Sequence, residues 1–494
     1  LPPSFYSLAL PTGLGKTLTS ISWALRHARQ NKLKRIIIVL PYINIIDQTA
    51  QILKDIFGEQ WILEHHSSYN ESLEDDEKLS PAQKRKRSAT ENWDYPIIVT
   101  TTVQFFESLF SNRPSKCRKI HNIAESVVIF DEVQTIPKDI ILPTLQMLKD
   151  IQVVMNTSFL FCTATQPAFG KRRKIDGIEC IQPLIEDSAV LYDATRRVEY
   201  RLLAGLKPLD YDELAHEVTT RGMTTLVIFN TKKAALEFFN RMVDTDKWER
   251  RYHLSTSMCP CHRKEVIGNI KDDLGDKKNI LVVSTQLIEA GVDFDFPLLF
   301  RAMAPLEGII QAAGRCNREG EPGKEYGQVY IFKLQDGGMP DKTYAACAGL
   351  AEEFIKSDIS QLYRHDVFEK YYSHAIDLYV EPDRFGINKS RNEFNFKVVS
   401  DSYHIIQKPS EGLYIYNFNE ESRELLHSLQ HKEFLSRSDY RRMQQFSVPV
   451  YENFIFQNSE QIQTMPQGFK VWYGNYDSVV GISLDPITVE QNIV

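Results

Sequence analysis

The chain has 494 residues, of which 43% are hydrophobic and 25% charged, with a formal net charge of −7 at pH 7. This composition is that of a globular protein of about three domains, and no apolar run reaches the ~20 residues that span a bilayer. The seven scattered cysteines exclude a secreted disulfide framework and indicate a reducing compartment, so we expect a cytoplasmic protein.

Residues 1–195 alternate short apolar runs with amphipathic stretches. Several of the runs are apolar nearly throughout, which is typical of parallel strands covered on both faces. The pattern predicts strands at 5–10, 35–40, 96–101, 126–130 and 158–163, with helices at 17–30 and 44–56. We therefore expect a doubly wound α/β domain.

A glycine-rich loop follows the first predicted strand and reads PTGLGKT over residues 11–17. Gly13 and Gly15 would let backbone N–H groups converge on phosphates. Lys16 would reach the β and γ oxygens, and Thr17 can ligate Mg²⁺. The loop predicts a binding site for ATP and Mg²⁺.

Two adjacent carboxylates end the strand at 126–130. ATP hydrolysis needs one acid to hold Mg²⁺ and another to orient water, and Asp131 and Glu132 fit these roles. At the end of the next strand, the hydroxyls of Thr163 and Thr165 would couple the phosphate site to the far side of the domain. Without the upstream loop, the same residues would be a helix cap and an ordinary turn.

Residues 196–336 repeat the α/β pattern without a second glycine-rich phosphate loop. The predicted strands are 224–229, 251–254, 279–284, 297–301 and 328–332. Two similar domains with one nucleotide loop indicate a shared site. On a helix, Gln311, Arg315 and Arg318 would lie on one face, and arginines from a second domain can stabilise charge on the γ-phosphate. The preceding segment 284–293 ends in Gly-Val-Asp.

The remaining chain changes character after Gly337. Residues 342–379 have helical spacing, within an expected linker at 337–383. From 384 to 494 we expect a small strand-rich domain, with runs at 413–418, 448–456, 469–472 and 479–484. The segment Cys-Pro-Cys-His at 259–262 has no second ligand pair, so we expect no zinc there. Basic runs at 84–87 and 171–174 are candidates for a nucleic-acid track, although a solvated surface is the commoner role of such runs.

In chain order, these motifs resemble the motif series of superfamily 2 helicases. The series is PTGLGKT, LPYINIIDQT, TTVQ, DEVQ, TAT, LVIFNT, STQLIEAGVD and QAAGRCNR. Its later members resemble the CRISPR-associated helicase–nuclease of type I interference systems. The resemblance implies two tandem RecA-like doubly wound domains that translocate 3′ to 5′ along single-stranded DNA, after recruitment by the RNA-guided surveillance complex. Gln134 stands where related helicases often carry His or Asp.

The resemblance also assigns roles to individual residues. ATP chemistry would fall to Lys16, Asp131, Glu132, Gln311, Arg315 and Arg318. Nucleotide contacts would come from Thr12, Gly13, Gly15, Lys16, Thr17, Gly291 and Asp293, with Mg²⁺ on Thr17 and Asp131. The nucleic-acid path would be lined by Pro41, Tyr42, Thr101, Gln104, Asn230, Thr231, Thr285 and Gln286. Contacts to phosphates there would be independent of base sequence and sensitive to salt.

The family's HD nuclease normally precedes the helicase, and the sequence shows no such domain before residue 1. His365-Asp366 is a lone dyad in a later, helical segment, and His65-His66 has no His-Asp partner at suitable spacing, so we expect neither to bind a nuclease metal. We therefore expect a fragment, or a motor whose nuclease is a separate subunit, and no nuclease activity from this chain alone. We also expect a monomer.

Three alternative functions remain at the level of sequence. A generic DNA or RNA helicase would carry the same motifs. A clamp that binds nucleic acid under ATP control without moving is a second alternative, against which Lys16, Glu132, Arg315 and Arg318 argue. A small-molecule kinase would have a lid in place of the second α/β domain.

Overall fold

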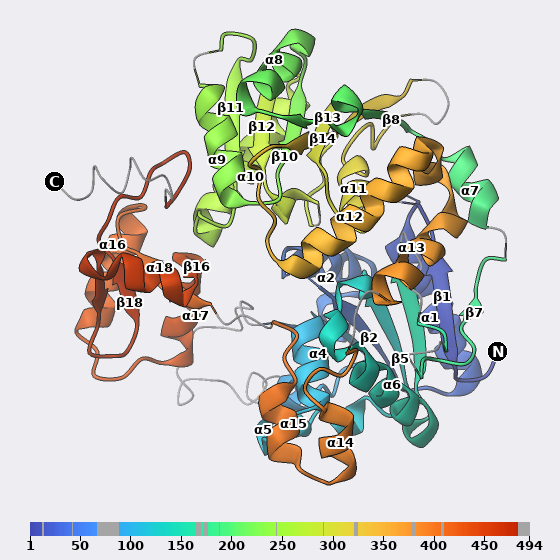
Figure 1. Cartoon of the computed structure of the whole chain (residues 1–494). Coiled ribbons are helices and arrows are strands. Elements are labelled where there is room, and N and C mark those ends of the chain that lie inside the picture. The colour runs from blue at the N-terminus through green and yellow to red at the C-terminus, as the bar shows by residue number, and fades with distance from the viewer. Residues whose placement is uncertain are drawn as a thin grey trace. The chain divides into compact units, whose positions relative to one another are not determined.

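The computed structural model describes residues 1–11, 14–41, 43–66, 88–163, 169–171, 176–186, 188–243, 245–289, 291–320, 325–377, 381–406 and 410–482. The chain forms two compact units, one of Leu1–Arg196 with Ser360–Gln407 and one of Arg197–Ile359 with Lys408–Val494. The helices within the described ranges are too short or too polar to cross a membrane. Figure 1 gives the element labels used below.

A seven-stranded, wholly parallel sheet forms the centre of the first unit. Its order is β3-β4-β2-β5-β6-β1-β7. The strands are β1 (Phe5–Ala9), β2 (Arg35–Leu40), β3 (Ile62–His65), β4 (Ile97–Thr101), β5 (Ser126–Asp131), β6 (Ser158–Thr163) and β7 (Gln182–Pro183). The five predicted strands are confirmed to within about a residue at each end, while β3 and β7 were not predicted.

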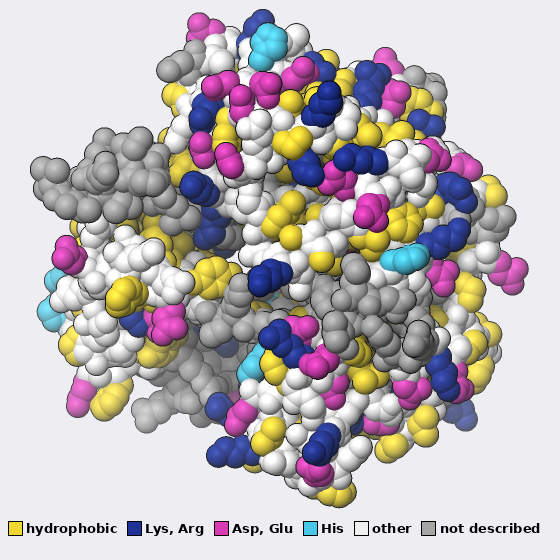
Figure 2. Space-filling model, in the orientation of Figure 1, with side chains coloured by type: hydrophobic (Ala, Val, Ile, Leu, Met, Phe, Trp, Pro, Cys, Tyr) yellow, Lys and Arg dark blue, Asp and Glu magenta, His cyan; other side chains and the backbone are white. Residues whose placement is uncertain are grey.

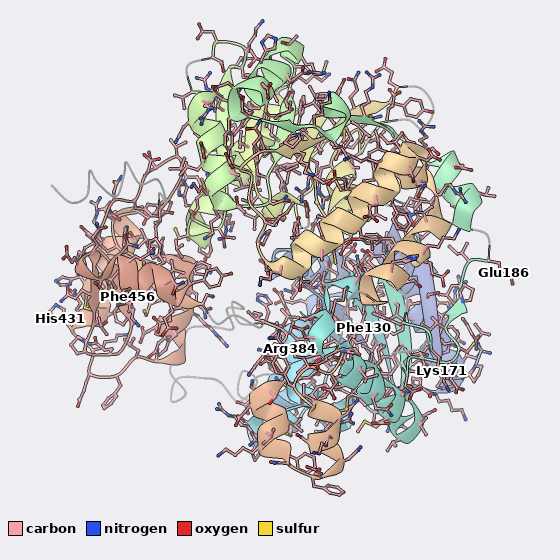
Figure 3. The ribbon with its side chains drawn as sticks, in the orientation of Figure 1. Phe130, Lys171, Glu186, Arg384, His431 and Phe456 are labelled. Atoms are coloured by element: carbon pink, nitrogen blue, oxygen red, sulfur yellow. The ribbon has the colours of Figure 1, made fainter. Side chains whose placement is uncertain are left out.

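Helices cover both faces of this sheet (Figure 1). Residues of α1 (Lys16–Asn31) and α2 (Ile43–Phe57) share one apolar core with Val127 and Ile129 of β5. The alternate residue Phe130 points to the opposite face, where it stacks on Phe106 of α4 (Thr102–Leu109) at 5.4 Å. The side chains of β5 are buried on both faces of the sheet, so the strand that leads to the two acids is fixed by packing. Phe130 is labelled in Figure 3.

Two short helices from the region expected to be strand-rich belong to the first unit. They are α14 (Ile387–Asn392) and α15 (Phe396–Ser402). The ring of Tyr403 stacks on Phe110 at 3.7 Å, and its hydroxyl hydrogen-bonds Thr144 of α6 (Ile141–Met155) at 2.8 Å. The expected strand character from residue 384 is therefore wrong for this stretch.

The second unit contains another parallel sheet, of order β11-β12-β10-β13-β14-β8, with β9 paired to β14. The strands are β8 (Val198–Leu202), β9 (Pro208–Leu209), β10 (Thr225–Ile228), β11 (Arg250–Leu254), β12 (Ile280–Ser284), β13 (Leu298–Ala302) and β14 (Gly327–Leu334). The associated helices are α8 (Tyr211–Arg221), α9 (Lys232–Arg241), α10 (Pro260–Gly275), α11 (Leu306–Ala313) and α12 (Lys342–Ser357). The prediction of two parallel-sheet α/β domains is confirmed.

The helical stretch expected at 342–379 is divided between the two units. Helix α12 ends at Ser357 in the second unit, and α13 (His365–Asp377) lies in the first. The chain therefore passes from one unit to the other directly after α12.

A small mixed sheet of order β16-β15-β18-β17 follows in the second unit. Its strands are β15 (Glu411–Ile415), β16 (Ser447–Val450), β17 (Ile462–Thr464) and β18 (Lys470–Trp472), with helices α16 (Glu420–Gln430), α17 (Arg437–Gln445) and α18 (Glu452–Gln457). Helix α18 replaces the second half of the strand predicted at 448–456. Tyr451, Phe454 and Ile455 fit helical spacing as well as a strand, and Phe456 is 84% exposed (Figure 3).

The Cys-Pro-Cys-His segment forms the start of α10 and contacts residues that follow the small sheet. The backbone N–H of Cys259 donates to the hydroxyl of Tyr476 at 2.9 Å. The two ring nitrogens of His262 hydrogen-bond that hydroxyl at 2.9 Å and the carbonyl of Ser478 at 3.0 Å. Because both nitrogens contact protein atoms, this segment anchors the C-terminal region to α10.

Candidate functional site

Three adjacent strand ends bring the predicted nucleotide residues of the first unit together. In the parallel sheet Ala9 lies beside Thr163, and Cys162 lies beside Asp131. The loop after β1, the end of β6 and the acids after β5 therefore meet at the carboxyl edge, where ligands of open α/β sheets bind.

Lys16 contacts both predicted acids. Its Nζ lies 3.5 Å from Glu132 Oε1 and 4.0 Å from Asp131 Oδ1, and all three side chains are less than a quarter exposed. Gly15 precedes α1 at φ 67°, a left-handed conformation that glycine adopts without steric cost. This turn directs Lys16, the first residue of α1, towards the acids.

Glu132 has a backbone conformation that its sequence does not reveal. It lies at φ 51° and ψ 44°, which costs a non-glycine residue roughly 1–3 kcal/mol and is concentrated at functional sites. Its N–H donates to the carbonyl of Cys162 at 3.0 Å, and the amide of Gln134 donates to its carboxylate. Backbone and side chain together fix the direction of the Glu132 carboxylate.

The charges at this edge influence one another. Burial, the largest cause, raises the pKa of Asp131; with the opposing effect of Lys16 and a further rise caused by Glu132, the pKa is about 6. Burial alone would lower the pKa of Lys16, but Glu132 and Asp131 raise it above its usual value. Lys16 therefore stays charged at neutral pH.

The donor set fits Mg²⁺. Among the described residues, Asp131 Oδ1 is buried and has no hydrogen-bond partner, which suits an oxygen that binds a cation. Mg²⁺ prefers one or two protein oxygens together with phosphate oxygens, and Thr17 and Asp131 offer such a pair.

Asp131→Asn tests the burial of this charge. Because the native state keeps the Asp131 proton up to about pH 6 and the unfolded chain loses it near pH 4, the free energy of unfolding of the wild type falls between these values. The variant lacks this loss. Its stability relative to wild type should rise by about 1–3 kcal/mol from pH 4 to pH 7 in urea denaturation. A difference independent of pH would contradict the assignment.

Other predicted residues of the first unit differ in how far the structure tests them. Thr163 is buried at the end of β6, and Thr17 lies in the first turn of α1. Thr12, Gly13, Tyr42 and Thr165 lie outside the described residues. Tyr192 of α7 (Ser188–Ala194) was not predicted from the sequence. Burial raises the pKa of its hydroxyl, which interacts electrostatically with Lys16 and Glu132.

In the second unit, the expected helix face of Gln311, Arg315 and Arg318 is wrong. Helix α11 ends at Ala313, so only Gln311 lies on it. The following residues pair instead with Phe296, which lies three residues after the Gly-Val-Asp segment: Phe296 N–H donates to the carbonyl of Arg315 at 2.9 Å, and Asn317 N–H donates to the carbonyl of Phe296 at 3.0 Å. Asn317 adopts φ 49°, which turns the chain away from helix.

This pairing places both arginines beside the segment at 288–295. Arg315 donates to the carbonyls of Ile288 at 3.2 Å and Glu289 at 2.8 Å. Arg318 forms an ion pair of 2.7 Å with Asp293, and its N–H donates to Asp295. Gly291 adopts φ 81°. The predicted residues Gly291, Asp293, Arg315 and Arg318 thus share one loop cluster.

The predicted nucleic-acid residues also gather at strand ends within each unit. Thr101 at the end of β4 pairs with Leu40 at the end of β2, the residue before Pro41. The hydroxyl of Thr101 caps α4 by accepting from the N–H of Gln104. In the second unit, β10 and β12 are neighbours, so Asn230 and Thr231 lie beside Thr285 and Gln286. The side chains of Thr101, Asn230 and Thr285 are buried, so a nucleic-acid strand would contact their exposed neighbours rather than these side chains.

The described residues on the face in Figure 2 form no continuous basic track. On the face in Figure 2, Lys and Arg side chains are interspersed with Asp and Glu. The run at 84–87 lies outside the described residues, as do all but Lys171 of the run at 171–174.

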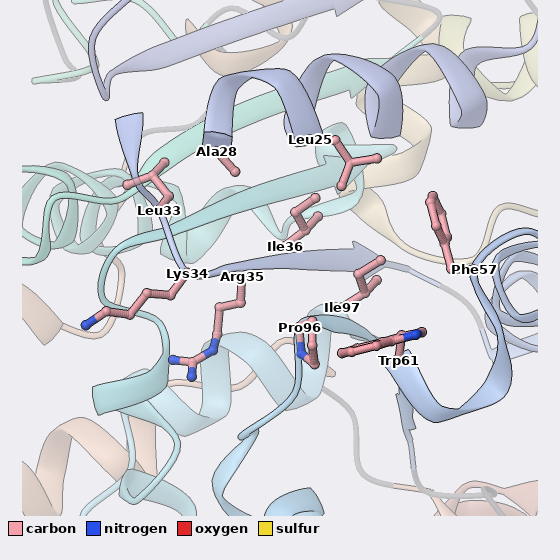
Figure 4. Close-up of a pocket in the computed structure, with 10 residues that line it drawn as sticks. All are labelled: Leu25, Ala28, Leu33, Lys34, Arg35, Ile36, Phe57, Trp61, Pro96 and Ile97. Atoms are coloured by element: carbon pink, nitrogen blue, oxygen red, sulfur yellow. The ribbon is translucent and has the colours of Figure 1, made fainter. Parts of the chain in front are cut away.

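A pocket of about 380 Å³ lies at the opposite edge of the first sheet (Figure 4). It is lined by Leu25 and Ala28 of α1, by Trp61, and by residues at the starts of β2 and β4. Because Lys16 and Asp131 follow the carboxyl ends of their strands, this pocket is separate from the predicted nucleotide site.

Among the described residues, one group of acids and histidine has the spacing of metal ligands. It comprises Asp47, Glu64 and His66. His66 Nε2 lies 2.9 Å from Glu64 and 3.2 Å from Asp47, while Lys54 contacts the other oxygen of Glu64 at 2.8 Å. The ammonium group of Lys54 already balances Glu64, so the group is a salt-bridge cluster. The side chains of His365 and Asp366 lie outside the described residues.

Two models of known protein families match this chain, one in each parallel-sheet domain. A family model for DEAD/DEAH box helicases matches residues 6–172, and one for the C-terminal part of the CRISPR-associated nuclease/helicase Cas3 matches 221–321. The chain is 26% identical to the CRISPR-associated nuclease/helicase Cas3 of Haloferax volcanii, over 68% of this chain and 47% of that protein. It thus spans about half the length of this relative.

Solved structures share the fold at low identity. The AMPPNP complex of T. fusca Cas3 matches with a TM-score of 0.67 and 14% identity, over 98% of this chain and 68% of the other. A chain in a CRISPR RNA-guided surveillance complex, pre-nicking, matches with a TM-score of 0.64 and 13% identity, over 98% of this chain and 68% of the other.

Proposed function

We propose that this chain, which belongs to the Cas3-type superfamily 2 helicases, is an ATP-hydrolysing motor that moves along single-stranded DNA. The observation that carries the proposal is the meeting of Lys16 with Glu132 and Asp131 at the carboxyl edge of the first sheet. A phosphate-binding lysine beside two fixed acids has the components that phosphoryl transfer to water requires.

In this proposal each residue has a separate task. The loop before α1 cradles the phosphates, and the ammonium group of Lys16 leaves Glu132 to bind the β and γ oxygens. Thr17 and Asp131 would hold Mg²⁺, which neutralises charge on the phosphates. Glu132 orients the water whose oxygen attacks the γ-phosphorus as the bond to the β-γ bridging oxygen breaks, and the water's proton passes to the carboxylate or to phosphate.

By analogy with the family, we also assign arginines of the second unit to the reaction. Arg315 and Arg318 would stabilise the negative charge that develops on the transferring phosphoryl group, with Gln311 completing the site. Arg318 forms an ion pair with Asp293. To bind phosphate, its guanidinium would have to exchange this carboxylate for the phosphate oxygens.

The finer parts of the proposal rest on the family. They are 3′ to 5′ movement, recruitment by an RNA-guided type I surveillance complex, and contacts to the strand near Pro41, Gln104, Thr231 and Gln286. The likeness to a chain in a solved surveillance complex supports the second of these.

ATP turnover with and without nucleic acid tests the proposal. Single-stranded DNA should stimulate turnover strongly and single-stranded RNA should not, and the stimulation should weaken as salt rises because phosphate contacts release counterions. Stronger stimulation by RNA would favour the generic helicase, and an absence of ATP turnover would reject the proposal.

A further inference from the structure

Arg301 is a fully buried arginine in the middle of the second unit's sheet domain. It lies on β13 with 0% exposure, and its guanidinium forms an ion pair of 2.8 Å with Glu289, whose side chain is 7% exposed. Burial raises the pKa of Glu289 to about 7 although Arg301 lies against it. A buried ion pair often contributes little net stability compared with apolar residues, so stability alone does not account for this one.

The guanidinium of Arg301 joins two further segments of the chain. It donates to Asn230 Oδ1 at 2.7 Å and to the hydroxyl of Tyr344 at 3.0 Å. The Tyr344 hydroxyl in turn donates to Asn230 Oδ1 at 2.9 Å. Asn230 follows β10, and Tyr344 lies in the first turn of α12. One closed polar network thus connects the ends of β10 and β13 with α12.

The same network reaches the arginine loop. Glu289 binds Arg301 through its side chain and accepts from Arg315 through its backbone carbonyl at 2.8 Å. On the other side, Gln286 donates to the backbone carbonyl of Asn230 at 3.0 Å. The network therefore includes the predicted nucleic-acid residue Asn230 and connects Gln286 with Arg315.

Helix α11 packs directly over the ion pair. A Cβ at Gly308 would lie 3.4 Å from the guanidinium of Arg301 and 3.5 Å from the Glu289 carboxylate. The backbone of α11, which leads into Arg315, is thus seated on Arg301 and Glu289. A movement of the pair would be transmitted to the arginine loop both through α11 and through the Glu289 carbonyl.

Helix α12 is also the element from which the chain passes into the first unit, after Ile359. We propose that Tyr344 and Arg301 are positioning residues that couple α12 and the nucleic-acid segment after β10 to the loop carrying Arg315. The inference rests on the proposed motor function and names the residues that would relay strand binding to the ATP site. Its physical basis is the ring of hydrogen bonds among Arg301, Tyr344 and Asn230, together with the ion pair to Glu289, whose rearrangement would move the end of β10, the loop after β12 and the packed helix α11 together.

Tyr344→Phe tests the relay because it removes one hydroxyl and keeps the ring. The matched control is Tyr414→Phe, which removes a buried hydroxyl that donates to the Ser422 carbonyl at 2.7 Å in the C-terminal sheet of the same unit. The readouts are ATP turnover with and without single-stranded DNA, and amide hydrogen exchange at residues 286–289 and 314–318.

For Tyr344→Phe we expect stimulation by DNA to fall about 5- to 10-fold, with turnover in the absence of DNA unchanged. Exchange at both segments should rise in this variant and stay at the wild-type level in Tyr414→Phe. Unchanged exchange, or equal effects of the two variants, would overturn the relay. If the wild type hydrolyses no ATP, the motor function fails, while the exchange comparison still decides whether Tyr344 positions the loop.

Discussion

Lys16→Ala is expected to lower ATP turnover to background while binding of single-stranded DNA persists. The ammonium group of Lys16 lies 3.5 Å from Glu132, and the glycine-rich loop motif assigns it to the β and γ oxygens of ATP. Loss of one such charge from a preorganised site costs at least about 10²- to 10³-fold in rate. Turnover should be followed by phosphate release, and DNA binding by fluorescence anisotropy without nucleotide.

The matched control is Lys34→Ala in the same unit. Lys34 is 64% exposed and pairs with Glu125 at the opposite edge of the sheet, so its loss should leave turnover and DNA binding unchanged. Turnover retained in Lys16→Ala would mean that the loop after β1 does not hold the phosphates. Loss of DNA binding in the same variant would mean that the substitution disrupts the unit more widely.

Arg318→Ala is expected to lower ATP turnover by about 10³- to 10⁵-fold with ATP binding retained, the effect of removing an arginine that stabilises the transferring phosphoryl group. Arg318 is the better test of the two arginines. Its side chain pairs only with the half-exposed Asp293 among the contacts given above, whereas Arg315 also holds the carbonyls of Ile288 and Glu289. Arg315→Ala should lose turnover and also loosen this loop.

The control for the arginine test is Arg201→Ala. Arg201 is 47% exposed and pairs with Glu199 at the edge strand β8, away from the arginine loop. Binding of a fluorescent ATP analogue and the thermal unfolding midpoint should match wild type in Arg318→Ala. Full DNA-stimulated turnover in that variant would show that the second unit does not complete the ATP site.

The residues of the first unit's site could be predicted because their motifs are local and follow apolar strands. Lys16, Asp131 and Glu132 each stand directly after a predicted strand or loop, and parallel pairing brings such ends to one edge. The left-handed backbone of Glu132 could not be predicted, since it is imposed by its hydrogen bond to Cys162 on a neighbouring strand.

Elsewhere long-range pairing decided against the local pattern. Residues 311–318 have a helical pattern, but Asn317 and Arg315 pair with Phe296, so the helix stops at Ala313. Arg301 was missed because a single arginine in an apolar strand carries no motif; its role depends on Glu289, Asn230 and Tyr344, which come from three other segments. Tyr192 was also missed, because a single tyrosine in a short helix belongs to no motif.

Displacement of streptavidin from biotinylated single-stranded DNA tests most directly whether the chain is a motor. With ATP, a 3′ to 5′ translocase should displace streptavidin from the 5′ end of the strand much faster than from the 3′ end, and Lys16→Ala should displace it from neither. Wild-type protein that hydrolyses ATP in response to DNA yet displaces streptavidin from neither end would contradict translocation and establish the clamp in its place.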